Sequence, residues 1–302
     1  MFDLQISSDE LNLTHTLTRG QAFRWKEDGQ GRWTGVVRGR VVTLWREGNN
    51  LKHEVVPKQD GFLEDYFRLD VRLEELYREF RQADENVSRA IDRFKGLRVL
   101  RQEPEETLLS YVCSTANSVS RITNSIEQLS KRYGERIEGT PAVAEAMAGR
   151  DYYSFPTAEA LAKADPDELA KSRGLGFRAA NLSCVARQLI ERPEGWLESL
   201  RRATYEEARR ELTCLRCVGM KIADCVLLFS LNKDQAVPVD THIRHIAVRN
   251  YLPEFMQKTL TQKVYRQIGD LFRQKFGPYA GWAQEYLYYD DLLRHSPQER
   301  IL

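Results

Sequence analysis

The hydrophobic pattern of the chain changes character after about sixty residues. Before that point, residues 21–26, 32–37 and 41–46 are rich in Val, Thr, Phe and Trp, and turns that contain glycine separate them. Short β-branched and aromatic runs with such connections are typical of strands joined as hairpins. This part of the chain therefore predicts an antiparallel meander.

From residue 71 onward, apolar residues recur at the three- and four-residue spacing of an α-helix. The spacing predicts helices over 73–80, 87–94 and 119–133, and the last of these ends at Gly134. The same periodicity continues to the end of the chain, so helix follows helix.

Signals for helix ends agree with this division. Pro104 suits a first helical position, and Thr204 with Glu207 has the spacing of a capping box. We therefore predict an α+β fold. A small antiparallel β-rich N-terminal domain, residues 1–95, packs on a larger all-α domain, residues 96–302.

The charge of the chain is balanced, with 45 Lys and Arg against 44 Asp and Glu. A content of 42% hydrophobic and 10% aromatic residues excludes a disordered chain, and the balance excludes a basic protein that coats nucleic acid. No apolar run reaches the ~18 residues of a membrane helix, and the acidic start lacks the pattern of a secretory signal. We expect an intracellular protein with no membrane contact.

The five cysteines fit reduced thiols better than a disulfide framework, because their number is odd and the chain is long. Cys214 and Cys217 form a C-x2-C, and Cys225 follows closely. A zinc or iron–sulfur site would need a fourth ligand nearby, and the sequence has no second C-x2-C and no His pair at metal spacing. We expect no metal site here.

Residues 208–231 carry the most informative pattern, two apolar-faced helices joined by a short turn that contains Val218 and Gly219. We expect Gly219 to supply a positive φ, which it adopts at no steric cost. In a helix-hairpin-helix, the second helix directs unpaired N–H groups outward, and its dipole adds partial positive charge. Such a turn binds a DNA phosphate without reading sequence. An ordinary αα-hairpin inside a bundle is the alternative.

Two candidate catalytic residues follow this turn. Lys221 begins the second helix, where the positive end of the helix dipole favours the neutral, nucleophilic amine. The loop at 235–241 contains Asp240, which is placed to cap the next helix and can also face a cleft. Together they suit cleavage at a sugar carbon, in which a carboxylate stabilises an oxocarbenium ion while an amine attacks C1′. Taken singly, a surface lysine and a plain helix cap are the ordinary interpretations.

The run from Leu215 to Asp240 resembles the signature of the helix-hairpin-helix (HhH-GPD) superfamily of DNA glycosylases. Within that superfamily, the chain is similar to the 8-oxoguanine DNA glycosylases. The resemblance implies a TBP-like N-terminal sheet beside a helical catalytic domain. Other matching segments follow the family's order over nearly the whole chain, at residues 20–25, 66–70, 174–179, 235–240 and 277–284.

The resemblance implies a bifunctional glycosylase and AP lyase that acts on double-stranded DNA containing 8-oxoguanine. The lysine at Lys221 expels the damaged base and forms a Schiff base, and the aspartate at Asp240 assists both steps. Subsequent β-elimination nicks the strand. Because the target nucleotide must leave the stack, a pocket must hold it.

In the implied pocket, Cys225 and Tyr288 sandwich the base, and Gln284 addresses its Watson–Crick edge. Tyr288 stands where the family usually has Phe. Gln284 and Tyr288 are four residues apart and share a helix face, as do Lys221 and Cys225. Gly20 matches the residue whose carbonyl accepts from N7–H, the donor that separates 8-oxoguanine from guanine. Without the family match, Tyr288 and Cys225 would be core residues and Gly20 a turn.

The same resemblance implies DNA contacts, although several positions depart from the family. Ala116 stands where the family has an asparagine that fills the vacated space, and Phe177 replaces a tyrosine wedge. Arg216 and Cys217 replace the usual proline and first glycine of the hairpin. These departures indicate looser selectivity for the opposite base, which Arg121 and Arg178 are implied to read. The implied DNA-contacting residues are Asn117, Arg121, Phe177, Arg178, Arg216, Val218, Gly219 and His242.

Three other classes of protein share parts of this pattern. A monofunctional glycosylase for alkylated bases keeps the aspartate but lacks the lysine at Lys221, and an endonuclease III-like enzyme has a C-terminal four-cysteine cluster. A DNA-binding scaffold would need neither Lys221 nor Asp240. We expect a monomer without cofactor or iron–sulfur cluster, and leave a monovalent cation at the hairpin open. We expect it in a prokaryotic cytoplasm, or in the nucleus if the source is eukaryotic.

Overall fold

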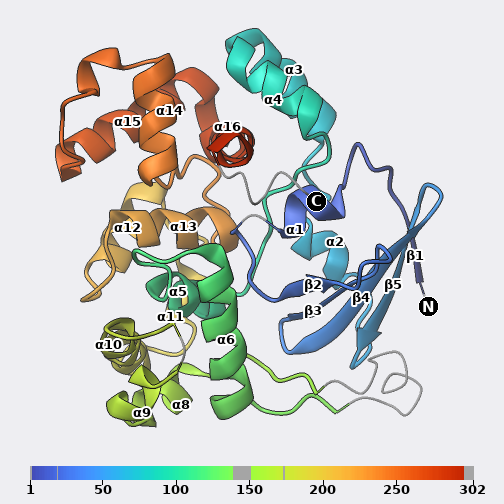
Figure 1. Ribbon diagram of the computed structural model, residues 1–302, viewed down its shortest axis with the longest axis vertical. Helices are drawn as coiled ribbons and strands as arrows, with labels where there is room; N and C mark the ends of the chain where they lie inside the picture. Colours follow the sequence, from blue (N-terminus) through green and yellow to red (C-terminus); the bar gives the residue numbers. More distant parts are fainter. Residues whose placement is uncertain (1, 19, 139–150, 173, 296–302) are drawn as a thin grey trace.

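The computed structural model describes residues 2–18, 20–138, 151–172 and 174–295. Its N-terminal part is a five-stranded sheet in the order β1-β5-β4-β3-β2, and every neighbouring pair is antiparallel. The remainder is helical and lies beside the sheet (Figure 1). The predicted α+β class is confirmed.

The sheet is larger than the predicted meander. The second and third predicted runs correspond to β3 and β4, whereas the first, residues 21–26, overlaps β2 only at Trp25 and Lys26. Strands β1 and β5 were not predicted from the pattern. Lys, His and Glu interrupt the apolar residues of β5, yet it pairs with β4 over seven positions. The strands are β1 (Phe2–Gln5), β2 (Trp25–Glu27), β3 (Trp33–Val37), β4 (Arg40–Glu47) and β5 (Asn50–Val56).

The helices begin and end where the sequence signals lie. Thr204 forms the expected capping box with Glu207, Pro104 is the first residue of α5, and Gly134 is the C-cap of α6. The helices before the hairpin are α1 (Leu13–Leu17), α2 (Phe62–Tyr66), α3 (Leu73–Ala83), α4 (Glu85–Arg93), α5 (Pro104–Val112), α6 (Val119–Tyr133), α8 (Ala158–Lys163), α9 (Pro166–Ala170), α10 (Arg178–Ile190) and α11 (Trp196–Ser199).

The hairpin helices and those after them complete the helical part. They are α12 (Tyr205–Thr213), α13 (Met220–Ser230), α14 (Thr241–Asn250), α15 (Gln262–Phe276) and α16 (Ala280–His295), with short 3-10 turns at η1 (Pro253–Phe255) and η2 (Gly277–Tyr279). Within the described ranges, no helix is long and apolar enough to span a membrane.

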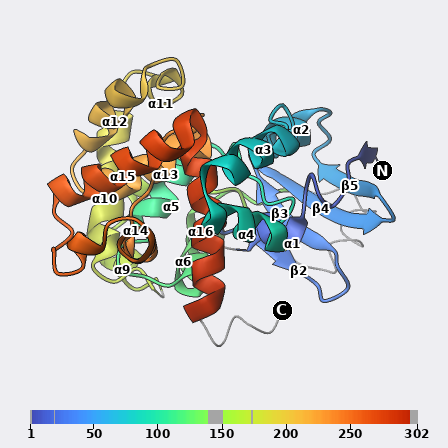
Figure 2. The same ribbon diagram turned by 90° about the horizontal axis from the view of Figure 1, so that it is seen from above.

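Two large hydrophobic clusters organise the described residues, beside a small third one at Val36 and Val41. One of the two lies against the sheet and includes Val42, Leu44 and Leu51, and the larger one joins the helices from α3 to α16. Helices α3 and α4 belong to the larger cluster, and α4 packs on α16 (Figure 2). Apart from Phe23 in the helical cluster and Leu100 in the sheet cluster, the two clusters divide near residue 70. The domain boundary near residue 95 stays a prediction.

Candidate active site

The helix-hairpin-helix consists of α12, a turn and α13. The left-handed backbone of this turn lies at Cys217, with φ 69°, and the expectation of a positive φ at Gly219 is wrong. Gly219 is the N-cap of α13 and has φ −86° and ψ 176°, because an N-cap residue adopts extended backbone. The chain reverses two residues earlier than expected, at a non-glycine residue.

The first turn of α13 offers backbone N–H groups to an anion. No side chain of the described residues caps this helix, and the N–H of Ala223 donates to the carbonyl of Gly219. The N–H groups before Ala223 belong to the first turn, where a helix provides no carbonyl partner, so they can bind an anion. Gln188 of α10 steadies the turn, because its Oε1 accepts from the N–H of Arg216 at 2.8 Å. Arg216 and Gly219 are exposed, whereas the Val218 side chain is buried. A ligand would therefore meet the backbone of the turn and the Arg216 side chain.

A cavity of about 50 Å³ lies where the N-terminus of α13, α16 and the loop at residues 235–241, which we name the catalytic loop, converge. It brings together all residues that the sequence predicts for the catalytic pair and the base pocket, although they come from separate parts of the chain. These residues are Gly20, Lys221, Cys225, Asp240, Gln284 and Tyr288.

Lys221 is the second residue of α13 and is half-buried at its N-terminus. Its Nζ lies 3.5 Å from Oγ of Ser114 and 5.1 Å from the centre of the Tyr111 ring. The ring face attracts a cation, while the helix N-terminus repels one. The amine thus lies at the wall of the cavity. Among the described residues, the Ser114 hydroxyl is the one side-chain group at hydrogen-bond distance from it.

Asp240 is the N-cap of α14, and its Oδ1 accepts from the N–H of Ile243 at 2.9 Å. The predicted cap is confirmed. A carboxylate has two oxygens, so capping leaves acceptor capacity on the side of the cavity that Asp240 also lines.

A buried carboxyl on α13 fixes the chain that leads to Asp240. Asp224 has no exposed surface and accepts hydrogen bonds from Tyr265 at 2.7 Å and from Arg209 at 3.0 Å. The Tyr265 oxygen in turn accepts from the N–H of Val239 at 3.2 Å. Burial raises the pKa of Asp224 to about 6, although Arg209 opposes the rise. The catalytic loop is thereby tied to the helix that carries the lysine.

Gly20 brings the N-terminal part of the chain to the cavity. It has φ 96°, and its carbonyl accepts a hydrogen bond from the hydroxyl of Tyr111 at 2.8 Å. Burial raises the pKa of Tyr111 well above 10, so this hydroxyl stays a donor at physiological pH. A carbonyl oxygen has two lone pairs, and one therefore remains for a base.

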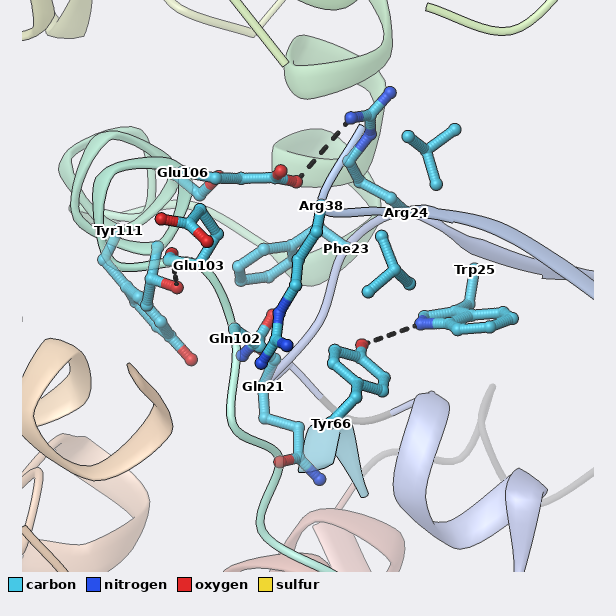
Figure 3. Close-up of a pocket in the computed structure, with 14 residues that line it drawn as sticks. Gln21, Phe23, Arg24, Trp25, Arg38, Tyr66, Gln102, Glu103, Glu106 and Tyr111 are labelled. Carbon is cyan, nitrogen blue, oxygen red and sulfur yellow. Dashed lines mark hydrogen bonds and ion pairs between the residues drawn. The ribbon is translucent and has the colours of Figure 1, made fainter. Parts of the chain in front are cut away.

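Gln21 ties the same loop to the segment that leads from α4 to α5. Its Nε2 donates to the carbonyl of Arg98 at 2.7 Å, and its Oε1 accepts from the N–H of Leu100 at 2.9 Å. Gln102 donates to the Gln21 carbonyl at 2.5 Å. Figure 3 shows Gln21, Gln102 and Tyr111 around a small cavity of about 20 Å³. Both parts of the chain thus set the position of the Gly20 carbonyl.

The apolar wall of the cavity comes from α13 and α16. Cys225 is 2% exposed, and burial raises its pKa to about 12, so it acts as a small neutral group. Tyr288 is half-buried and meets the His242 ring edge-on, with ring centres 5.5 Å apart. Nδ1 of His242 lies 3.0 Å from Oδ2 of Asp291, which holds the ring in place.

Tyr111 and Glu285 are among the lining residues that the sequence analysis missed. Glu285 is the one charged residue between Ala280 and Tyr289 on α16, and a lone charge in such a stretch is a signal that could have found it. Tyr111 carries no such signal, because its hydroxyl contacts a residue 91 positions away.

Apart from Arg121 on α6, the residues predicted to face the opposite strand lie at residues 114–118 and 174–178, which we name the opposite-base loops. Arg178 is 9% exposed, and its guanidinium donates to the Ala116 carbonyl at 2.6 Å. Ala116 itself has φ 48° and is exposed. Phe177 is 63% exposed, and the centre of its ring lies 4.4 Å from the guanidinium carbon of Arg178. Arg178 thus links the two loops.

The remaining predicted contacts differ in accessibility. Nδ2 of Asn117 donates to the carbonyls of Cys113 at 3.2 Å and Gly174 at 3.4 Å, so this amide also joins the two loops. Arg121 is exposed on the first turn of α6. In the described part of the chain, no group of three or more His, Cys, Asp or Glu is arranged to hold a metal ion.

Family comparisons cover most of the chain. Residues 3–108 match the N-terminal domain of 8-oxoguanine DNA glycosylase, and residues 109–273 match the HhH-GPD superfamily base excision DNA repair protein. An Arabidopsis thaliana protein named N-glycosylase/DNA lyase OGG1 is 33% identical over 301 residues, which cover 96% of this chain and 80% of the relative.

Two solved structures are similar over nearly their whole length. The Clostridium acetobutylicum 8-oxoguanine glycosylase/lyase, bound to double-stranded DNA with cytosine opposite 8-oxoG, is 28% identical with a TM-score of 0.83 and covers 95% of this chain and 93% of that one. MBOgg1 in complex with a low-affinity DNA ligand is 32% identical with a TM-score of 0.85, and the match covers 97% and 96% of the two chains.

Proposed function

The chain belongs to the HhH-GPD superfamily of base excision DNA repair proteins, and we propose that it is a bifunctional DNA glycosylase and AP lyase that excises 8-oxoguanine from duplex DNA. One observation carries the proposal: Lys221, Asp240 and Gly20, which lie far apart in the sequence, line one cavity. The printed names of the relatives, N-glycosylase/DNA lyase and 8-oxoguanine glycosylase/lyase, support the same activity.

Binding begins at the DNA backbone. The N–H groups at the start of α13 hold a phosphate, and the target nucleotide leaves the stack and enters the cavity. Cys225 and Tyr288 contact the two faces of the base, and Gln284 meets its Watson–Crick edge. The Gly20 carbonyl accepts from N7–H of 8-oxoguanine, whereas guanine would bring a lone pair against it and leave it unpaired.

Chemistry follows from the catalytic pair. The amine of Lys221 attacks C1′, the bond from C1′ to N9 breaks, and the base leaves with the bonding electrons and then takes up a proton. Asp240 stabilises the positive charge that develops on the sugar. The amine adduct loses its N–H proton and the bond from C1′ to O4′ breaks, which opens the sugar to a Schiff base and leaves a hydroxyl at C4′. Loss of a proton from C2′ then expels the 3′ phosphate in a β-elimination, and hydrolysis of the imine releases Lys221.

The setting of this reaction follows from its substrate. A single chain supplies all six predicted pocket residues, so we propose that a monomer suffices. The steps above use no metal or other cofactor. The substrate assigns the enzyme to the compartment that holds DNA, the cytoplasm of a prokaryotic cell or the nucleus of a eukaryotic one.

Borohydride trapping tests the proposal. A duplex with a single 8-oxoguanine opposite cytosine is incubated with the protein and sodium borohydride, which reduces a Schiff base to a stable amine. We expect a covalent protein–DNA adduct with the wild type and none with Lys221→Gln. Lys171→Gln, at an exposed lysine on the C-terminal side of α9, serves as the matched control and should trap like the wild type.

Two outcomes would contradict the proposal at different points. Equal trapping by Lys221→Gln would remove Lys221 as the nucleophile while leaving the activity in place. Release of no 8-oxoguanine by the wild type, under conditions in which it binds the duplex, would overturn the glycosylase assignment itself.

A further inference from the structure

A carboxyl group is buried in the wall of the base pocket beside the residue proposed to read the base. Glu285 lies on α16, is 8% exposed and lines the same cavity as Lys221 and Asp240. Burial raises its pKa to about 8, and the nearby Asp240 adds to the rise while Lys221 opposes it. At neutral pH this group is therefore mostly an uncharged acid. The glycosylase chemistry proposed above does not use it.

Glu285 contacts the amide of Gln284. Nε2 of Gln284 donates to Oε1 of Glu285 at 3.3 Å, and the Gln284 side chain is 2% exposed. Its other amide atom, Oε1, is buried without a hydrogen-bond partner among the described residues. Unpaired buried acceptors are rare because their desolvation is not compensated. An orphan oxygen at the wall of a ligand cavity indicates that a donor on the ligand completes it.

We propose that Glu285 is a positioning residue that fixes the Gln284 amide with its oxygen toward the flipped base, so that the pocket selects purines whose Watson–Crick edge carries N–H donors. This inference rests on the proposed function. An amide side chain that no neighbour holds can rotate by half a turn and so present either its oxygen or its NH2 group to the base. In the observed arrangement Oε1 of Glu285 accepts from the NH2 group, and the amide oxygen is left for the ligand.

The donor pattern of the base decides the outcome. An oxidised guanine presents N1–H and a 2-amino group along this edge, and both can donate to the Gln284 oxygen. An oxidised adenine presents a lone pair at N1, which would oppose that oxygen. A site built to accept from a donor rejects an analogue without it, because the buried acceptor is then left unpaired.

The test compares two substrates in single turnover, 8-oxoguanine and 8-oxoadenine, each opposite cytosine in the same duplex. Glu285→Leu frees the Gln284 amide, so we expect the ratio of the two excision rates to fall about tenfold, the effect of losing one to two net hydrogen bonds. Glu285→Gln keeps an acceptor for Nε2 of Gln284 and should hold the ratio within about threefold of wild type. Asp290→Asn removes a carboxylate from the same helix outside the cavity and should leave both rates unchanged.

A double-mutant cycle separates positioning from a general effect on the fold. In a Gln284→Ala background, Glu285→Leu should change the ratio by less than about twofold, because a residue that acts through Gln284 has nothing left to orient. Circular dichroism checks the fold, and Glu285→Ala, which adds no bulk, replaces Glu285→Leu if the latter does not fold.

The results that overturn the inference differ from those that overturn the function. An unchanged ratio in Glu285→Leu and Glu285→Ala, or effects of the two substitutions that multiply in the double variant, would remove Glu285 as a positioning residue while 8-oxoguanine excision persists. A wild type that excises neither base would instead remove the proposed function.

Discussion

The wall of the base pocket and the opposite-base loops direct their polar groups in opposite ways. In the pocket, the Gly20 carbonyl keeps a lone pair and the Gln284 oxygen has no protein partner among the described residues. In the opposite-base loops, Arg178 and Asn117 use their donors on carbonyls in these loops or directly beside them. The acceptors of the pocket wall have room for a hydrogen-bond donor on a ligand, whereas the donors of the opposite-base loops already have partners within the protein.

This difference teaches where selectivity resides. A region whose acceptors wait for a ligand discriminates strongly, because a wrong ligand leaves a buried group unpaired. A region whose donors already bond within the protein must break those hydrogen bonds before it contacts a base. The free energy gained from each new hydrogen bond is therefore partly offset by the one that is lost. We therefore expect strict recognition of the damaged base and weak recognition of its partner.

The largest effect is expected at the catalytic pair. Asp240→Asn removes the charge that stabilises the sugar cation but keeps an oxygen for the α14 cap, so excision of 8-oxoguanine should fall by about 100-fold to 1,000-fold. Duplex binding should stay within about threefold of wild type, because the phosphate contacts are unchanged. Single-turnover excision and fluorescence anisotropy measure the two quantities. Excision within a few-fold of wild type would show that Asp240 is only a helix cap.

The next effect concerns stability, because the pocket region buries two carboxyl groups. Burial raises the pKa of Asp224 to about 6 and of Glu285 to about 8, above the value of about 4 in an unfolded chain. Between about pH 4 and pH 8 the folded state therefore binds protons that the unfolded state releases. The free energy of unfolding should fall as the pH rises through this window. The stability that depends on these two carboxyl groups being protonated should be fully present only below about pH 4.

Urea unfolding at a series of pH values checks this dependence. Glu285→Gln cannot titrate, so it should lose less stability than the wild type between about pH 6 and pH 9, by an amount on the order of 2 kcal/mol. Asp290→Asn, on the same helix, is the control for loss of a carboxylate. Parallel pH curves for wild type and Glu285→Gln would show that Glu285 is not a buried neutral acid.

The smallest effect is expected at the opposite-base loops. The wild type should excise 8-oxoguanine opposite C, A, G and T with rates that differ by less than about tenfold, since Ala116 offers no polar side chain. Ala116→Asn places an amide at a position with φ 48°, which asparagine tolerates, and should raise the preference for cytosine by about threefold. Rates on the four duplexes measure this preference, with Thr115→Asn on the same loop as the control. Strict cytosine preference in the wild type would contradict the comparison between the two regions.

Much of this architecture could be predicted from sequence, because its signals are local or periodic. The capping box at Thr204 and the cap at Asp240 depend on residues three positions away, and both are confirmed. The six residues predicted for the catalytic pair and the pocket line one cavity, an outcome that the family resemblance supplied and spacing alone could not.

The features that escaped prediction depend on distant contacts or on exact backbone angles. The meeting of Tyr111 with Gly20 is set by how α5 packs against the N-terminal loop, which no local pattern encodes. The positive φ at Cys217, in place of Gly219, follows from where α13 takes its N-cap. Strand β5 is defined by its partner β4 more than by its own residues.

The three hydrogen bonds that hold Gln21 against the segment between α4 and α5 also join the proposed reader of the base to the rest of the molecule. Without them the Gly20 carbonyl has no fixed place. A chain trimmed by a protease at its N-terminus would keep Lys221 and Asp240 but lose the Gly20 carbonyl. In the proposed mechanism, such a fragment would keep the groups that cut the strand and lose the group that selects the damaged base.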